Sequence, residues 1–192
     1  ISAGADCFIF CDTNGGTLPE EVRKILSEVT DKYPKKKFGV HFQNDNGCAV
    51  VNSMVAVDLG VDHVQGTING YGERTGNADL CTLIPNLSLK QNYKTIPTDS
   101  LGKLTQTANH IAELVNVSID SRHPYVGSSA FTHKAGLHAS GMSKDSSLYE
   151  HIDASKVGNF TRTTVSELAG RASVITKAEE FGLSINNDEA KD

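Results

Sequence analysis

The sequence contains no tryptophan, only two methionines and four cysteines, and no long hydrophobic run. A membrane-spanning helix needs about 20 consecutive apolar residues, and no segment of this chain approaches that length. Cys7, Cys11, Cys48 and Cys81 form no Cys-x-x-Cys pair, which argues against a disulfide framework. With 18 basic and 23 acidic side chains the net charge is −5, so no basic surface for nucleic acid or anionic membrane is expected. We therefore expect a cytoplasmic protein with reduced cysteines.

What the chain does contain is an ordinary globular composition, with 38% hydrophobic residues among 192. Three short apolar runs have the pattern of buried parallel strands: residues 5–10, 38–42 and 63–68. A helical pattern follows each run. We expect Thr17 to be the N-cap of the first helix, because Glu20 stands three residues later, as in a capping box.

This alternation of strands and helices predicts an α/β fold with three parallel βα units. After Pro85 the pattern becomes helical, and a last helix is expected from Thr164 to Gly182. We place a boundary near residue 95, with βα units in residues 1–95 and a mostly helical subdomain in residues 96–192. Three βα units cannot close a barrel, so we expect further strands to complete the sheet.

Polar residues follow the first two predicted strands, at the edge where α/β folds bind ligands. His41 and Gln43 are two apart on a strand and therefore share one face. They form either a weak metal pair or a hydrogen-bonded strand end, because an amide oxygen is a poorer ligand than an imidazole. Asp12 and Thr13 either orient a substrate carboxylate or cap a turn.

The loop after the third predicted strand, residues 69–77, has the composition of a ligand-binding loop. Its three glycines permit close approach of the backbone to a ligand. It lacks the G-x-G-x-x-G pattern and a P-loop lysine, so nucleotide binding is not indicated. Its polar members are Asn69, Glu73, Arg74 and Asn77.

A second polar cluster lies in the predicted subdomain, where His133, Lys134 and His138 stand close together between glycines. Histidines there can transfer protons near neutral pH, or they can simply cap helices. No Ser-His-Asp order and no zinc-finger spacing accompany them.

Two long segments resemble one enzyme family. Residues 41–90, with HFQNDNGCAVV and TINGYGERTGNAD, and residues 123–159, with FTHKAGLHASGMSKDSSLYEHIDASKVGN, are similar to the α-isopropylmalate, homocitrate and citramalate synthases. The combination is most similar to the citramalate-forming branch, which is associated with isoleucine biosynthesis. The resemblance implies the C-terminal part, about three βα units, of a TIM (β/α)8 barrel, followed by a mostly helical subdomain. It covers residues 4–182.

In this family a divalent metal ion (Zn²⁺, Mn²⁺ or Mg²⁺) holds the 2-oxo acid substrate. The resemblance implies that His41 is the first histidine of the family's H-x-H metal pair and that Asn77 lies at the metal. Gln43 stands where the family has its second histidine. An amide oxygen is a better ligand for the harder ions than for Zn²⁺. Gln43 is therefore expected either to complete the metal site or to impair metal binding.

The resemblance also implies substrate-binding and catalytic residues. Thr13 corresponds to the threonine that binds the 2-oxo acid carboxylate, and Glu73 and Arg74 belong to the substrate-binding GERTGN motif. His138 and Tyr149 correspond to catalytic residues on the acetyl-CoA side. The implied reaction deprotonates the methyl group of acetyl-CoA, adds the enolate to the ketone of pyruvate, and hydrolyses the thioester. The active enzyme is expected to be a homodimer.

The family's first-strand arginine and metal-binding aspartate would precede Ile1, so we expect a C-terminal fragment that is inactive alone. Three alternatives stay open: a 2-isopropylmalate or homocitrate synthase, an enzyme like hydroxymethylglutaryl-CoA lyase, and a catalytically impaired homologue. Residues 124–158 argue against the lyase, because that appendage is typical of the synthases. Gln43 is the feature that favours impairment.

Overall fold

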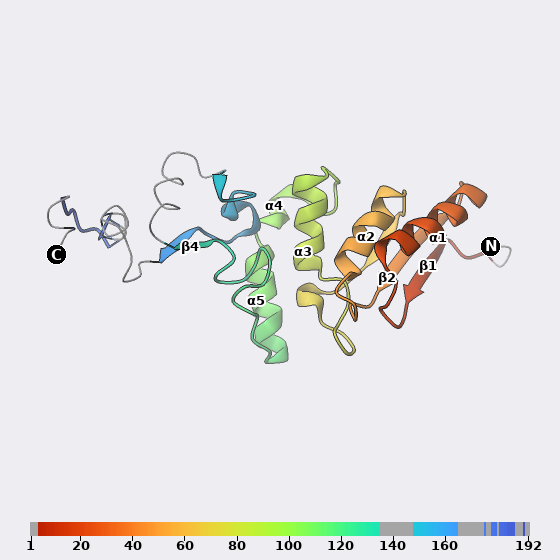
Figure 1. The fold of residues 1–192 in the computed structure, drawn as a ribbon, viewed down its shortest axis with the longest axis horizontal. Coiled ribbons are helices and arrows are strands. Elements are labelled where there is room, and N and C mark those ends of the chain that lie inside the picture. The colour runs from red at the N-terminus through yellow and green to blue at the C-terminus, as the bar shows by residue number, and fades with distance from the viewer. Residues whose placement is uncertain are drawn as a thin grey trace. The chain divides into compact units, whose positions relative to one another are not determined.

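The computed structural model describes residues 4–134, 148–164, 175, 178–179, 181–186 and 190 (Figure 1). The chain forms two compact units. The first consists of Ile1–Pro97 and Thr107–Ser118, and the second of Thr98–Gln106 and Ile119–Asp192.

The first unit is built on a parallel three-stranded sheet. Its strands are β1 (Cys7–Asp12), β2 (Lys37–Phe42) and β3 (His63–Gln65), hydrogen-bonded in the order β1-β2-β3. Helix α1 (Pro19–Lys32) connects the first two strands, and α2 (Ala49–Asp58) connects the second two. The predicted parallel βα units are confirmed.

One face of this sheet packs against α1 and α2. Side chains alternate along a strand, so Phe38, Val40 and Phe42 of β2 all point to the helix side, where they are buried. Val40 is completely buried. The same core contains apolar residues of both helices and of the segments that flank them, namely Val22, Leu26, Ala49, Val55, Ala56, Val61 and Ala78.

The other face of the sheet carries polar side chains at its carboxyl end. Cys11, His41 and Gln65 are neighbours across the three strands, because Cys11 pairs with His41 and His41 with Gln65 in the register. Cys11 and Gln65 are exposed and His41 is half-buried. The candidate metal residue on β2 therefore lies on the face that the helices leave open.

The start of α1 differs from the prediction. The helix begins at Pro19 with Leu18 as its N-cap, so Thr17 as the N-cap is wrong. The carboxylate of Glu21, not Glu20, accepts from the Leu18 N–H at 2.9 Å. The Thr17 N–H instead donates to the Asp12 side chain at 3.1 Å, which ties the helix entrance to the end of β1.

The chain after β3 turns through short helical segments. The third strand ends at Gln65, earlier than predicted, and η1 (Ile68–Gly70) follows it. Helix α3 (Leu80–Pro85) begins after Asp79, whose carboxylate caps its first turn. It continues beyond Pro85 as a π-helical turn, η2 (Asn86–Lys90).

The second unit contains α4 (Thr98–Leu101) and the first residues of α5 (Leu104–Val115), the remainder of which belongs to the first unit. A short helix, η4 (Ala154–Val157), follows later. Strands β4 (Thr132–Lys134) and β5 (Arg162–Thr164) pair in parallel. The sequence predicted no strand here.

The β4–β5 pair also overturns the predicted start of the last helix, because Thr164 is the final residue of β5. Most of the segment from Thr164 to Gly182 lies outside the described residues.

The buried Asn159 stabilises the second unit by donating from its side-chain nitrogen to the carbonyls of Tyr125 and Gly127, both at 3.0 Å. In the described part of the chain, no helix combines the length and apolar character that a membrane crossing requires.

Candidate functional site

The loops that follow β1, β2 and β3 are joined to one another at the carboxyl edge of the sheet. The Gln43 N–H, just after β2, donates to the Asp12 carbonyl at the end of β1. The Asn44 N–H donates to the carbonyl of Gly76, in the loop after β3, at 2.8 Å. Parallel strands end at one edge, so polar side chains from three separate loops converge there.

His41 contacts the side chain of its neighbour on β3. Its Nδ1 lies 3.1 Å from Oε1 of Gln65. An amide oxygen can only accept a hydrogen bond, so this contact is a hydrogen bond in the tautomer that carries its proton on Nδ1. The lone pair of the neutral ring then lies on Nε2, which is the nitrogen available to a metal ion.

Gln43 and Asn77 form an antiparallel bridge directly beyond the end of β2. The Asn77 amide nitrogen donates to the Tyr71 carbonyl at 3.0 Å, and this hydrogen bond orients the amide group. The remaining oxygens, Gln43 Oε1 and Asn77 Oδ1, are buried and accept no hydrogen bond in the described structure. Buried polar atoms normally have partners, so two neighbouring exceptions require an explanation.

These orphaned oxygens provide the test of whether the site suits a divalent cation. Amide oxygens are ligands for hard cations, and His41, two residues before Gln43, adds an imidazole nitrogen. The set of His41, Gln43 and Asn77 therefore fits a cation, although all three donors are neutral. Among the described residues, no group of three or more His, Cys, Asp or Glu side chains is arranged to hold a metal.

Arg74 links the loop after β3 to the other two loops. Its Nε and Nη2 donate to both carboxylate oxygens of Asp45, at 2.7 and 3.0 Å, and Nη2 also donates to the Thr13 carbonyl at 2.8 Å. The hydrogen bond from Arg74 lowers the pKa of Asp45, and the same contact raises the pKa of Arg74. The predicted substrate residues Thr13 and Arg74 are thus brought together. Glu73 is 82% exposed and lies 3.7 Å from the Arg74 guanidinium.

An open depression of about 680 Å³ lies over this linkage. Sequence reasoning missed Asp45 as a member of the site. Its position two residues beyond Gln43, in the loop at the end of β2, was the available signal. The depression is lined by Cys11, Asp12, Thr13, Asn14, Asp45 and Arg74.

Gly76 lets the loop reach this arrangement. Its φ is +91°, and a Cβ atom there would overlap the carbonyl oxygen of Gly70. Any other residue at this position would therefore displace the backbone that leads into Asn77.

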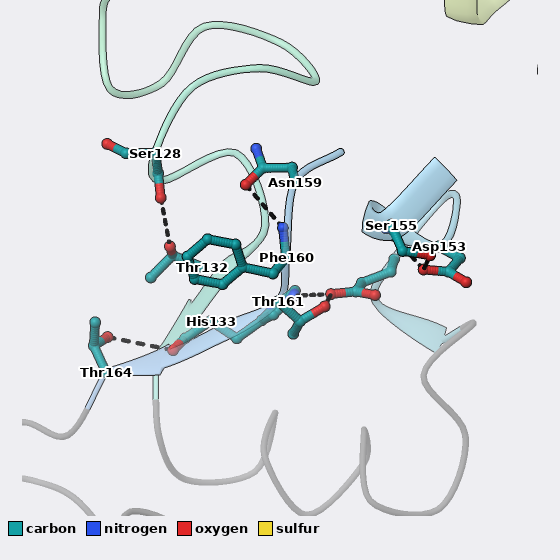
Figure 2. A network of polar contacts seen from close by, with 10 residues as sticks. Ser128, Thr132, His133, Asp153, Ser155, Asn159, Phe160, Thr161 and Thr164 are labelled. Atoms are coloured by element: carbon teal, nitrogen blue, oxygen red, sulfur yellow. Dashed lines mark hydrogen bonds and ion pairs between the residues drawn. The ribbon is translucent and has the colours of Figure 1, made fainter. Parts of the chain in front are cut away.

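The second unit holds Tyr149, whereas His138 lies outside the described residues. Tyr149 is 42% exposed. The next residue, Glu150, has its carboxylate fixed by two donors: His133 Nε2 at 3.2 Å and Thr161 Oγ1 at 2.6 Å. Both donors, His133 and Thr161, are labelled in the network of polar contacts in Figure 2. The backbone beside Tyr149 is thereby tied to β4 and to the entrance of β5.

Comparison with protein families matches both parts of the chain. Residues 1–111 match the HMGL-like family, and residues 125–192 match the family described as homocitrate synthase post-HMGL domain-like.

Among curated proteins, the (R)-citramalate synthase of Aquifex aeolicus is 49% identical over 97% of this chain and 35% of its own length. A 2-isopropylmalate synthase of Bacillus anthracis is 36% identical over 98% of this chain and 38% of its own length. The chain thus spans about a third of the length of these relatives.

Among solved structures, the HMG-CoA lyase of Bacillus subtilis superposes with a TM-score of 0.54 at 25% identity, covering 63% of this chain and 42% of the other. The likeness supports the expected barrel-type α/β fold.

Proposed function

Because the chain belongs to the HMGL-like family, we propose that its protein condenses acetyl-CoA with pyruvate to form (R)-citramalate. Residues 1–111, which include the expected barrel part, match this family, and residues 125–192, within the expected subdomain, match the synthase-type post-barrel family. The second match favours a synthase over a lyase. The higher identity to citramalate synthases, 49% against 36% for the isopropylmalate synthase, favours pyruvate as the 2-oxo acid.

One observation carries the assignment of the site: Gln43 and Asn77, paired directly beyond the end of the strand that holds His41, have buried, unpartnered oxygens. His41, Gln43 and Asn77 would hold the divalent ion. When bound, such an ion supplies Lewis-acid polarisation of the ketone oxygen of the 2-oxo acid.

The loops after β1 and β3 bind and orient the substrate in this proposal. Thr13 contacts the carboxylate of the 2-oxo acid. Arg74 is already hydrogen-bonded to Asp45 and to the Thr13 carbonyl, so it contributes by holding Thr13 in place. Glu73 is exposed and is available to a substrate or to a neighbouring segment.

Tyr149 and His138 act on the acetyl-CoA side. One of them takes part in the proton transfer that generates the enolate, and the fixed Glu150 keeps the backbone beside Tyr149 in position. We further propose that the active protein is a homodimer, in which the subdomain of one protomer serves its neighbour.

A substrate comparison tests the reaction. The full-length protein that contains these residues is freed of metal, supplied with Mn²⁺, Mg²⁺ or Zn²⁺, and assayed for CoA release from acetyl-CoA. Pyruvate, 2-oxoisovalerate and 2-oxoglutarate are compared in parallel, with reactions lacking the 2-oxo acid as controls. Preferential release with pyruvate is expected. Preferential release with 2-oxoisovalerate would identify a 2-isopropylmalate synthase instead.

A second candidate follows from Gln43 itself. If its amide cannot replace an imidazole, the protein is an impaired homologue that keeps the fold and has lost the reaction. Assaying Gln43→His beside the natural protein separates the two cases, because activity that appears only in the variant would establish impairment.

A further inference from the structure

We propose that Gln65 is a positioning residue for His41: its side-chain oxygen selects the ring tautomer that presents Nε2 to the metal ion. The inference rests on the proposed function, because it assigns His41 to the metal. It concerns a residue of β3 that the proposed reaction does not otherwise use.

The backbone holds Gln65 opposite His41. The two residues are Cα partners in the β2–β3 register, and their side chains share the face that the helices leave open. Val64 points the other way, into the core. Beyond the strand, the Thr67 N–H donates to the Ala78 carbonyl at 3.0 Å, which fastens the end of β3 to the segment before α3.

The chemistry of the contact has one consequence for the ring. A neutral imidazole has one N–H donor and one lone pair, and an acceptor opposite Nδ1 fixes the proton there. The 3.1 Å contact with Gln65 Oε1 supplies that acceptor. Without it, the ring is free to adopt the tautomer whose proton blocks Nε2.

The other ligands of this site make the expected loss of metal affinity large. The other two donors, Gln43 and Asn77, offer neutral amide oxygens, so the imidazole nitrogen is the strongest electron donor of the three. Loss of a partner that orients a metal-binding histidine commonly reduces metal affinity 10–100-fold. Gln65 itself is exposed, and substitution of an exposed residue usually changes the free energy of unfolding by only about 0.5 kcal/mol.

The test measures the Mn²⁺ dissociation constant of the full-length protein, from the electron paramagnetic resonance signal of free Mn²⁺. Gln65→Met keeps the side-chain length and removes the acceptor, and we expect binding about 10–100-fold weaker. Gln65→Glu keeps an acceptor oxygen, and we expect binding at least as tight as in the natural protein. His63→Leu, on the same face of β3, is the matched control and should leave the dissociation constant unchanged.

Unfolding curves in EDTA show whether each variant folds, and Gln65→Thr serves as a second truncation if Gln65→Met does not. Natural affinity in a folded truncation, or equal weakening in Gln65→Glu, would overturn the proposal. Failure of the proposed reaction is distinguishable from failure of this proposal. A protein that releases no CoA, but whose Mn²⁺ affinity changes as expected in the Gln65 variants, refutes the reaction alone. A protein that releases CoA and binds no Mn²⁺ refutes the role of Gln65.

Discussion

Replacing Gln43 by methionine should have opposite effects on stability in the absence and in the presence of metal. Gln43 Oε1 is buried without a hydrogen-bond partner. Such an acceptor costs about 1–3 kcal/mol of folding free energy. Methionine has a similar length and no strong acceptor, so Gln43→Met removes this cost. We expect the free energy of unfolding of the metal-free protein to rise by about 1 kcal/mol, the lower end of that range.

Bound metal reverses the order of stability of the Gln43→Met variant and the natural protein. An ion at 100 times its dissociation constant stabilises the protein that binds it by about 2.7 kcal/mol. The natural protein should gain this increment, and Gln43→Met should lose most of it. The variant is therefore expected to be the more stable protein in EDTA and the less stable one in saturating Mn²⁺.

Denaturant unfolding of the full-length protein, first in EDTA and then with increasing Mn²⁺, measures two quantities: the stability difference between the metal-free proteins and the stabilisation of each protein by the ion. Gln91→Met is a suitable control, because Gln91 Oε1 is also buried and unpartnered, whereas its amide nitrogen bonds Asp58 away from the three loops. It should keep the full gain from metal. A metal-free Gln43→Met protein clearly less stable than the natural one would refute the argument from the orphaned oxygen.

Three other perturbations test individual contacts within the two units. Gly76→Ala places a methyl group against the Gly70 carbonyl at a φ of +91°, so we expect about 1–3 kcal/mol of destabilisation in denaturant unfolding and loss of metal binding; a fully stable variant would contradict the backbone argument. Thr161→Val removes the 2.6 Å hydrogen bond to Glu150 and should lower the free energy of unfolding by about 1 kcal/mol, whereas Thr161→Ser should not. Burial raises the pKa of Cys81 from 9.0 to about 12. The unfolded chain therefore loses this proton first, and stability should fall by up to about 1.4 kcal/mol per pH unit between those values. Cys81→Ala should flatten that slope in unfolding curves recorded from pH 8 to 11; an unchanged slope would exclude the thiol as its cause.

The features that the sequence predicted correctly depend on neighbours within one element. The strand at residues 38–42 was predicted from its apolar run, and the alternation of Phe38, Val40 and Phe42 follows because side chains of a strand point to opposite faces. His41 lies on the other face by the same rule, whereas Gln43 follows the strand. The parallel βα units were therefore predictable from local pattern.

The features that escaped prediction depend on partners distant in the sequence. Thr17 has the right chemistry for an N-cap, but its N–H is bonded to Asp12 across the loop, and the helix starts one residue later. Arg74 and Asp45 are joined only because the loops after β2 and β3 meet. β4 and β5 have three residues each, too few to show alternation. The role of Gln65 depends on register, which no single-strand pattern contains.

The neutrality of the donor set leads to a last prediction, on the choice of metal ion. One imidazole and two amide oxygens suit Mg²⁺ and Mn²⁺, whereas Zn²⁺ prefers nitrogen and sulfur ligands. Gln43→His replaces an amide oxygen by a second imidazole nitrogen two residues after His41. We therefore expect the ratio of Zn²⁺ to Mg²⁺ affinity to rise at least about tenfold, equivalent to 1.4 kcal/mol. Competition titrations of the metal-free full-length protein measure that ratio in Gln43→His and in the natural protein. An unchanged ratio in Gln43→His would mean that the side chain at position 43 does not reach the metal, and the amide oxygen would then need another explanation for its burial.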